Sequence, residues 1–109
     1  TLYGDNPPCP FCDNLGERIM LRETPTMIVV KNDFPYQVFD GLPVSHHILL
    51  VPRRHTAVLD DFDEQEIHDY WHLVSEYHLQ GYSFMTRSAK STNRSVPAHL
   101  HTHLFTVEE

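Results

Sequence analysis

Residues 99–105 read His-Leu-His-Thr-His-Leu-Phe, so that three histidines alternate with leucine and threonine. Successive side chains of a β-strand point to opposite faces, which would put the three histidines on one face and the two leucines on the other. Leucines on one face of a strand indicate a buried core on that side. The stretch therefore predicts a strand over residues 99–107 that holds three imidazoles in a row.

Three interpretations of this three-histidine strand compete. The strand could expose a polar face, which is ordinary for one histidine but unusual for three in alternation. Two or three imidazoles on a strand are also suitable zinc ligands. Alternatively, a neutral imidazole can attack phosphorus when a neighbour holds its other nitrogen, and a second histidine can then protonate the leaving group. The pattern favours a chemical role over an exposed polar face.

The rest of the chain predicts an α+β fold with an antiparallel sheet of about five strands and one long helix. β-branched and apolar runs bounded by proline and glycine indicate strands, whereas apolar residues at three- and four-residue spacing indicate a helix. Residues 32–45 are expected to form a long loop, because prolines and a glycine interrupt them. The predicted strands are residues 19–21, 27–31, 46–51, 82–86 and 99–107, and the predicted helix is residues 61–79.

The predicted helix carries its own start and stop signals. Asp61 and Glu64 have the spacing of a capping box, in which each side chain bonds the backbone of the other residue. Gly81 follows the last turn, where glycine often ends a helix. The residues expected to face the core are Ile67, Tyr70, Trp71, Val74 and Tyr77.

The composition limits the classes of function. The 109 residues are enough for a single domain, residues 1–109, with one modest core. The chain has 15 Asp and Glu against 8 Lys and Arg, and this acidic balance argues against a nucleic acid polymer or an anionic membrane as partner. No apolar run reaches the length of a membrane span, and no apolar segment typical of a signal peptide opens the chain. We therefore expect a cytoplasmic protein.

Several motifs together resemble the histidine triad (HIT) family. The stretch at residues 99–105 is similar to the family signature, in which histidine alternates with apolar residues three times. Residues 47–55, His-Ile-Leu-Leu-Val-Pro-Arg-Arg-His, resemble the family's run of His, four apolar residues, Pro, two further residues and a second His. Ser-Val at residues 95–96 and Cys-Pro-Phe-Cys at residues 9–12 resemble the Ser-Val before the triad and the C-x-x-C of bacterial members. The resemblance covers nearly the whole chain and implies a HIT-like fold.

The resemblance also implies a covalent mechanism. The middle histidine of the family's triad is the nucleophile, and it corresponds to His101. It would attack the α-phosphate of a nucleotide and form a nucleotidyl-imidazole that water or another acceptor resolves. His103 would lie near the leaving group, Ser95 would hydrogen-bond that group, and His47 would shape the site beside the nucleophile. One extra residue before the triad departs from the commoner spacing and affects where Ser95 lies.

Cys9, Cys12, His55 and His99 match the four zinc ligands of the zinc-bearing bacterial members. Two thiolates and two imidazoles suit tetrahedral zinc, and a full set of protein ligands is typical of a structural ion. Such an ion would fasten the N-terminal segment to the central strands. Without the resemblance, C-x-x-C is ambiguous between a zinc site, a redox pair and two buried thiols.

The family acts on nucleoside phosphoramidates, dinucleoside polyphosphates and nucleotidylated leaving groups, so the resemblance implies a nucleotide substrate. Asn32 stands where the family places an acidic or amide residue for the ribose hydroxyls. Arg87, or Ser88, stands where many members have a phosphate-binding Asn, and Arg94 where many have Gln. Arginines at these positions would favour an anionic substrate. Many members are homodimers, and the long helix and the strand after it would provide the contacts.

Two other functions remain open on the sequence. A metal-dependent hydrolase would use the triad histidines as ligands and keep an open position for water. A nucleotide-binding protein would keep the fold and lose the turnover. His68 and His72 have the four-residue spacing of a helical zinc pair, but no third ligand accompanies them, so we expect them to face solvent or a second subunit. Phe34 and Tyr36 could pack either on the nucleotide base or in the core.

Overall fold

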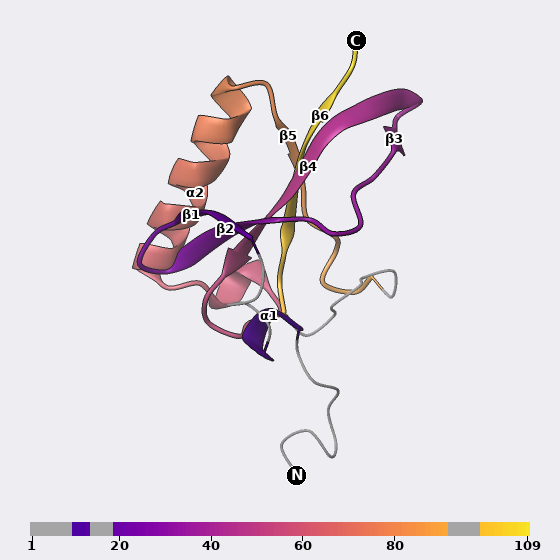
Figure 1. Cartoon of the computed structure of the whole chain (residues 1–109). Coiled ribbons are helices and arrows are strands. Elements are labelled where there is room, and N and C mark those ends of the chain that lie inside the picture. Colours follow the sequence, from indigo (N-terminus) through magenta and orange to yellow (C-terminus); the bar gives the residue numbers. More distant parts are fainter. Residues whose placement is uncertain (1–9, 14–18, 92–98) are drawn as a thin grey trace.

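The most apolar runs of the chain form the centre of one antiparallel sheet. Strand β2 (Met27–Lys31) pairs with β4 (Leu42–Pro52), and β4 pairs with β6 (Thr102–Val107). Strand β1 (Met20–Glu23) lies beside β2 and β5 (Ser83–Met85) beside β6, so the strand order is β1-β2-β4-β6-β5. The short β3 (Val38–Phe39) pairs with the first residues of β4 (Figure 1). The predicted α+β architecture, with an antiparallel sheet and one long helix, is confirmed.

The computed structural model describes residues 10–13, 19–91 and 99–109. No helix within these residues is long and apolar enough to cross a membrane. The remaining elements are α1 (Pro10–Asp13), β1 (Met20–Glu23), β3 (Val38–Phe39), the 3-10 helix η2 (Leu59–Asp61), α2 (Glu64–Leu79) and β5 (Ser83–Met85).

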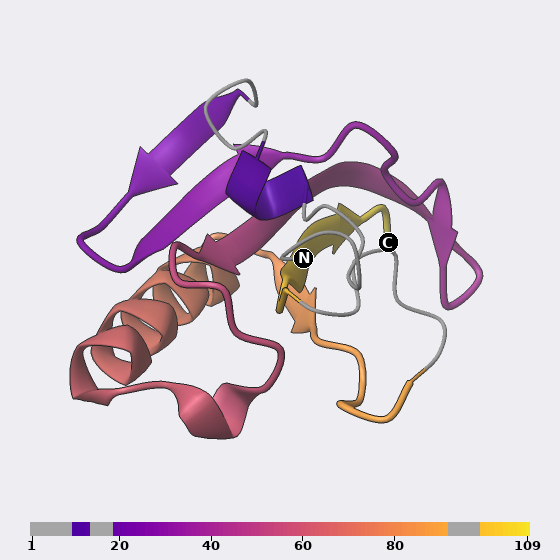
Figure 2. The ribbon, with the colours of Figure 1, turned by 90° about the horizontal axis from the view of Figure 1, so that it is seen from below.

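Apolar side chains cover both faces of the sheet. On β2, Met27 and Val29 join the cluster packed against α2, whereas Ile28 and Val30 join a second cluster that contains Phe11 of α1. None of these five side chains is more than 2 % exposed. The two helices thus lie on opposite sides of the central strands (Figure 2). The alternation of β2 is what allows one strand to serve both cores.

Helix α2 begins three residues later than the sequence predicts, and its capping box is formed by a different pair. Asp63 is the N-cap: its side chain accepts a hydrogen bond from the backbone N–H of Glu66 at 2.8 Å. The Glu66 carboxylate accepts one from the backbone N–H of Asp63 at 2.9 Å. The predicted pair, Asp61 and Glu64, has the same spacing, but Asp61 ends η2 and the buried Phe62 follows it. The insertion of Phe62 into the core sets where the helix can start.

The buried face of α2 differs in part from the predicted face. Val74 and Tyr77 are buried and Tyr70 is half-buried, as predicted. Ile67 and Trp71, however, are 55 % and 62 % exposed, so their predicted place in the core is wrong. The helix is rotated so that polar residues of its first two turns face the sheet instead.

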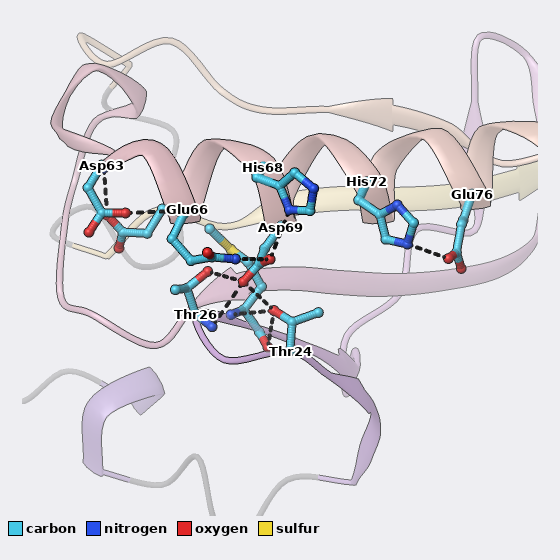
Figure 3. Close-up of polar contacts among 10 residues, drawn as sticks. Thr24, Thr26, Asp63, Glu66, His68, Asp69, His72 and Glu76 are labelled. Carbon is cyan, nitrogen blue, oxygen red and sulfur yellow. Dashed lines mark hydrogen bonds and ion pairs between the residues drawn. The ribbon is translucent and has the colours of Figure 1, made fainter.

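A buried carboxylate accounts for this rotation. Asp69 is 5 % exposed and accepts hydrogen bonds from the hydroxyls of Thr26 at 2.6 Å and Thr24 at 3.0 Å, and from the Gln65 side chain at 2.8 Å (Figure 3). Burial raises the pKa of Asp69, but these hydrogen bonds and one from His68 outweigh it and lower the pKa to about 2. Asp69 therefore ties the turn between β1 and β2 to α2 as a charged group.

The last strand is shorter than predicted. Strand β6 begins at Thr102, so His99 and His101 precede it rather than lie within it. The backbone N–H of Leu100 donates to the carbonyl of Thr56 at 2.6 Å. Leu100 is therefore bonded to the loop after β4 and not to a neighbouring strand. For this reason the pairing of β6 with β4 starts only at Thr102.

The expected loop at residues 32–45 contains a hairpin. Strand β3 pairs with the first residues of β4, and Asp40 and Gly41 connect them with φ values of 53° and 76°. Two residues with positive φ form the tight turn that matches the twist of a hairpin, and Asp-Gly suits it. The prediction missed the hairpin because β3 has only two residues and prolines flank it.

Substitution of Asp69 by Asn tests the link between α2 and the β1–β2 turn. We expect the variant to lose about 1–3 kcal/mol of unfolding free energy at pH 7, because an amide places donors against the threonine donors. Asp60→Asn, at an exposed position of η2, is the charge-matched control. Urea unfolding of both variants measures the difference.

The same comparison has a defined pH dependence. The folded protein holds the pKa of Asp69 at about 2, against an ordinary value of 3.8. The unfolded chain therefore takes up the proton first as the pH falls, so the stabilisation by Asp69 is complete above pH 3.8 and is lost as the pH falls toward 2. A stability difference between parent and Asp69→Asn that stayed constant from pH 6 to 2 would contradict this assignment.

Candidate active site

The backbone carbonyl of His99 determines which nitrogen of His101 carries the proton. Nδ1 of His101 lies 3.0 Å from this oxygen, and a carbonyl can only accept, so Nδ1 is the protonated nitrogen. Nε2 then carries the lone pair. His101 is 5 % exposed, and the ring of Phe11 packs against it with centroids 5.3 Å apart. The imidazole is thus held in one tautomer, with its lone pair on Nε2.

A second pair of imidazoles forms a directional hydrogen-bond chain. The backbone N–H of Tyr36 donates to Nδ1 of His47 at 2.8 Å, so the proton of the His47 ring is on Nε2. This Nε2–H donates to Nδ1 of His103 at 2.9 Å. The proton of the His103 ring is therefore on Nε2. This hydrogen-bond chain of imidazoles runs from Tyr36 through His47 to His103. The Nε2–H of His103 is the donor at its end.

Burial keeps both imidazoles of this chain neutral. His47 and His103 are 5 % and 8 % exposed. Burial lowers the pKa of His47 from 6.5 to about 4. Burial also lowers the pKa of His103, to about 3, with smaller contributions from His101, His47 and the charge of Arg87. At neutral pH these two imidazoles are therefore hydrogen-bond donors and acceptors of fixed direction rather than imidazolium charges.

Tyr36, which the sequence placed either on the nucleotide base or in the core, contacts the histidines and Arg87 in a way that the sequence did not indicate. Its ring lies 4.3 Å from that of His47 and stacks on that of His103 at 5.2 Å with an angle of 20° between the planes. Its hydroxyl accepts a hydrogen bond from Nη2 of Arg87 at 3.2 Å. Phe39 and Phe105 pack behind it. The only available signal was an aromatic residue in the loop before the His47 strand.

Asn32 also contacts the imidazole chain. Its amide nitrogen lies 3.2 Å from Nδ1 of His47, and its amide oxygen accepts the backbone N–H of Phe34 at 2.9 Å. The side chain is half-buried, whereas that of Phe34 is 88 % exposed. Asn32 therefore reaches the site from the end of β2 and helps to position His47.

Three described residues form a candidate metal centre next to the triad. Sγ of Cys12 lies 3.0 Å from Nδ1 of His55 and 3.4 Å from Nδ1 of His99, and the three atoms all lie within 4.8 Å of one another. Nε2 of His99 donates to the carbonyl of Pro52 at 2.8 Å, which leaves its Nδ1 as the ligand atom. One thiolate and two imidazoles form a donor set that fits a transition-metal ion.

Three predicted site residues lie outside the described residues: Cys9, Arg94 and Ser95. His68 and His72 face solvent on α2, as predicted, with side chains 74 % and 57 % exposed. Their rings lie parallel, and His72 contacts Glu76 at 2.9 Å (Figure 3). They lie on the helix that covers the other face of the sheet and take no part in the triad site.

The tautomers and the low pKa values can be tested by NMR. We expect ¹⁵N shifts to identify the Nε2–H form for His47 and His103, which titrate near pH 4 and 3. Because the unfolded chain protonates these imidazoles near 6.5, the unfolding free energy should fall as the pH drops below 6.5. Titration of either residue near pH 6.5, or an Nδ1–H form of His47, would contradict the hydrogen-bond chain.

The comparisons with known proteins agree on the fold. No protein-family model and no curated protein matches the sequence. A HIT family hydrolase from Legionella pneumophila Philadelphia 1 has a TM-score of 0.66 at 18 % identity, covering 94 % of this chain and 95 % of that one. A HIT family hydrolase from Clostridium thermocellum has 0.69 at 21 %, covering 94 % and 92 %. A histidine triad nucleotide-binding protein from Candida albicans has 0.65 at 20 %, covering 89 % and 73 %. The chain therefore has the HIT fold, as its sequence motifs implied.

Proposed function

We propose that the chain is a nucleotidyl hydrolase or transferase that works through a covalent nucleotidyl-histidine on His101. The observation that carries this proposal is the hydrogen bond from Nδ1 of His101 to the carbonyl of His99, which leaves Nε2 as a nucleophile on a buried, fixed ring. Solved proteins with this fold include ones described as HIT family hydrolases and as a nucleotide-binding protein, which supports the same class of chemistry.

In the proposed reaction, the lone pair of His101 Nε2 attacks the α-phosphorus of a nucleotide. The N–P bond forms while the bond from phosphorus to the leaving group breaks, and the electron pair departs with that group; a phosphate leaves as an anion, whereas an amine takes up a proton from solvent as it leaves. The Nε2–H of His103 donates a hydrogen bond to the phosphoryl or leaving-group oxygen, because His47 occupies its other nitrogen. Water or another acceptor then attacks phosphorus and releases its proton to solvent, while the N–P bond breaks and its electron pair returns to Nε2 of His101.

The substrate class is a nucleoside phosphoramidate or a dinucleoside polyphosphate. Asn32 is proposed to bind the ribose, and Arg87 the phosphates, with Arg94 and Ser95 as further contacts from the segment before the triad. The half-buried positions of Asn32 and Arg87 next to the imidazole chain support this assignment. The rival metal-dependent hydrolase is less well supported, because His99 faces Cys12 and His103 faces His47.

The nucleophile is tested by following AMP release from an adenosine phosphoramidate and from a diadenosine polyphosphate. His101→Ala should lower the rate by roughly a thousandfold or more, because it removes the atom that attacks phosphorus. His46→Ala is the matched control, since His46 is an exposed histidine of β4 that directly precedes His47. If His101→Ala, still folded, matched the parent, the covalent mechanism would be wrong. If the parent bound AMP but released none from either compound, the nucleotide-binding function without catalysis would replace it.

We further propose that the metal centre holds structural zinc through Cys9, Cys12, His55 and His99. The contacts of Cys12 with His55 and His99, and the hydrogen bond that orients His99, support this ligand set. When bound, zinc would supply a link between the N-terminal segment and the sheet, and none of the steps above passes through it.

The zinc proposal predicts about one zinc per chain by elemental analysis of the purified protein. Cys12→Ser and His55→Ala should retain little zinc, and a chelator should lower the melting temperature of the parent but hardly change that of either variant. His72→Ala, an exposed histidine on α2, should bind as much zinc as the parent. A full zinc content in Cys12→Ser would exclude this ligand set.

A homodimer is proposed through α2 and β5. Strand β5 lies at the edge of the sheet, and Phe84 on it is 44 % exposed. The exposed Ile67 and Trp71 add apolar surface on α2. Apolar side chains of this size at an open strand edge support a second copy as the partner.

A further inference from the structure

A cavity of about 390 Å³ lies between the end of α2 and strands β2 and β4. This volume is within the range of small-molecule binding sites in proteins. The side chains that line it come from β2, β4, the last turn of α2 and the segment after that helix, and they include those of Lys31, Ile48, Tyr77 and Tyr82. None of these four residues takes part in the functions proposed above.

The cavity opens on the face of the sheet that α2 covers. Lys31 lies on this face, because side chains two residues apart on a strand point the same way and the preceding members of its row on β2 pack under α2. Ile48, the partner of Lys31 on β4, packs against the same cluster. His101, in contrast, contacts Phe11 of α1, and α1 lies on the other side of the sheet (Figure 2). The cavity is therefore separate from the candidate nucleophile.

The hydroxyl of Tyr77 is a buried donor on the wall of this cavity. Tyr77 is 7 % exposed, and its hydroxyl forms no hydrogen bond with any residue that the structure describes. Burial raises the pKa of Tyr77, so the hydroxyl keeps its proton at neutral pH. Buried hydroxyls are ordinarily hydrogen-bonded. An unpaired one on a side chain that lines a cavity indicates a polar ligand in that cavity.

The charge around the cavity favours an anion. The chain has 15 Asp and Glu, yet none of them is among the described residues that line the cavity. Lys31 is exposed and forms no ion pair within the same part of the chain. An ammonium and a phenolic hydroxyl can both donate to carboxylate oxygens. A carboxylate would therefore satisfy the two groups that the protein leaves without an acceptor.

The rest of the wall suits a flat apolar body. The rings of Tyr77 and Tyr82 meet edge to face, with centroids 5.1 Å apart and 79° between the planes. Ile48 and Tyr82 are half-buried, so part of each side chain remains available to a ligand. Aromatic ligands pack well against tyrosine rings in such edge-to-face or offset arrangements.

We propose that this cavity binds a small aromatic carboxylate. Lys31 and the hydroxyl of Tyr77 hold the carboxylate, and the aromatic body of the ligand packs against Ile48 and Tyr82. The site does not depend on the proposed function, because it uses neither the triad histidines nor the metal centre.

The experiment is a calorimetric titration with 2-naphthoate and with 2-naphthamide, which has the same shape and no charge. The parent should bind the acid at least about threefold more tightly than the amide, and Lys31→Gln should remove this difference. Lys90→Gln, at an exposed lysine that does not line the cavity, is the charge-matched control and should bind both compounds as the parent does. Equal binding of acid and amide by the parent, or no binding of either, would overturn the proposal.

Tyr77→Phe tests the hydroxyl, because it deletes that group and keeps the ring. The variant should bind 2-naphthoate about three- to tenfold more weakly than the parent. Without ligand, it should unfold at the same urea concentration as the parent or at a higher one, since no hydrogen bond within the described residues is lost. A lower urea midpoint would show that the hydroxyl has a partner in the protein and would contradict its role in ligand binding.

A competition experiment separates the cavity from the candidate active site, because Asn32 and His47 also line the cavity. AMP should not displace 2-naphthoate from the parent. Displacement would mean that the probe occupies the nucleotide site and would overturn the proposal. If the parent bound no AMP, the proposed function would fail, and the comparison of Lys31→Gln with Lys90→Gln would still decide whether the cavity binds a carboxylate.

Discussion

The arrangement of the site depends on His99, which is held through three different groups. Its Nε2 donates a hydrogen bond to the carbonyl of Pro52, and its Nδ1 faces Cys12 and His55. Its own backbone carbonyl accepts a hydrogen bond from Nδ1–H of His101. The cluster of Cys12 and His55 and the β4 backbone therefore orient the same residue whose carbonyl sets the tautomer of His101. The contacts of the His99 ring with Pro52 and Cys12 therefore help to fix the tautomer of His101.

The histidines of the candidate site lie on a face of the sheet that aromatic side chains cover. Tyr36, Phe39 and Phe105 surround the imidazole pair, and Phe11 covers His101. Apolar surroundings disfavour imidazolium, so the protons of the site are held in a hydrogen-bond chain of fixed direction. A positive charge lies beside these imidazoles, because Arg87 donates to the hydroxyl of Tyr36, whose ring stacks on His103. The aromatic rings thus supply apolar surroundings, and the arginine supplies charge, at the same histidine pair.

The sequence predicted the parts of the structure that depend on local pattern, and failed where packing chooses between equal patterns. The alternation at residues 99–105 located the triad, although the strand starts only at Thr102. Two overlapping acidic pairs with capping-box spacing precede α2, and only the burial of Phe62 selects the second. Trp71 has helical spacing with core residues but lies outside the core because Asp69 is bonded to the β1–β2 turn. Tyr36 acts through its backbone N–H and a stacked ring, which no spacing rule encodes.

The contact between Phe11 and His101 joins two segments that are separated by almost the whole chain. During synthesis the ribosome releases α1 long before the residues that cover its aromatic ring exist. The nascent chain therefore carries an uncovered apolar side chain until the triad residues have been translated. A long loop must close to bring these two segments together, which places the completion of the candidate site late in folding.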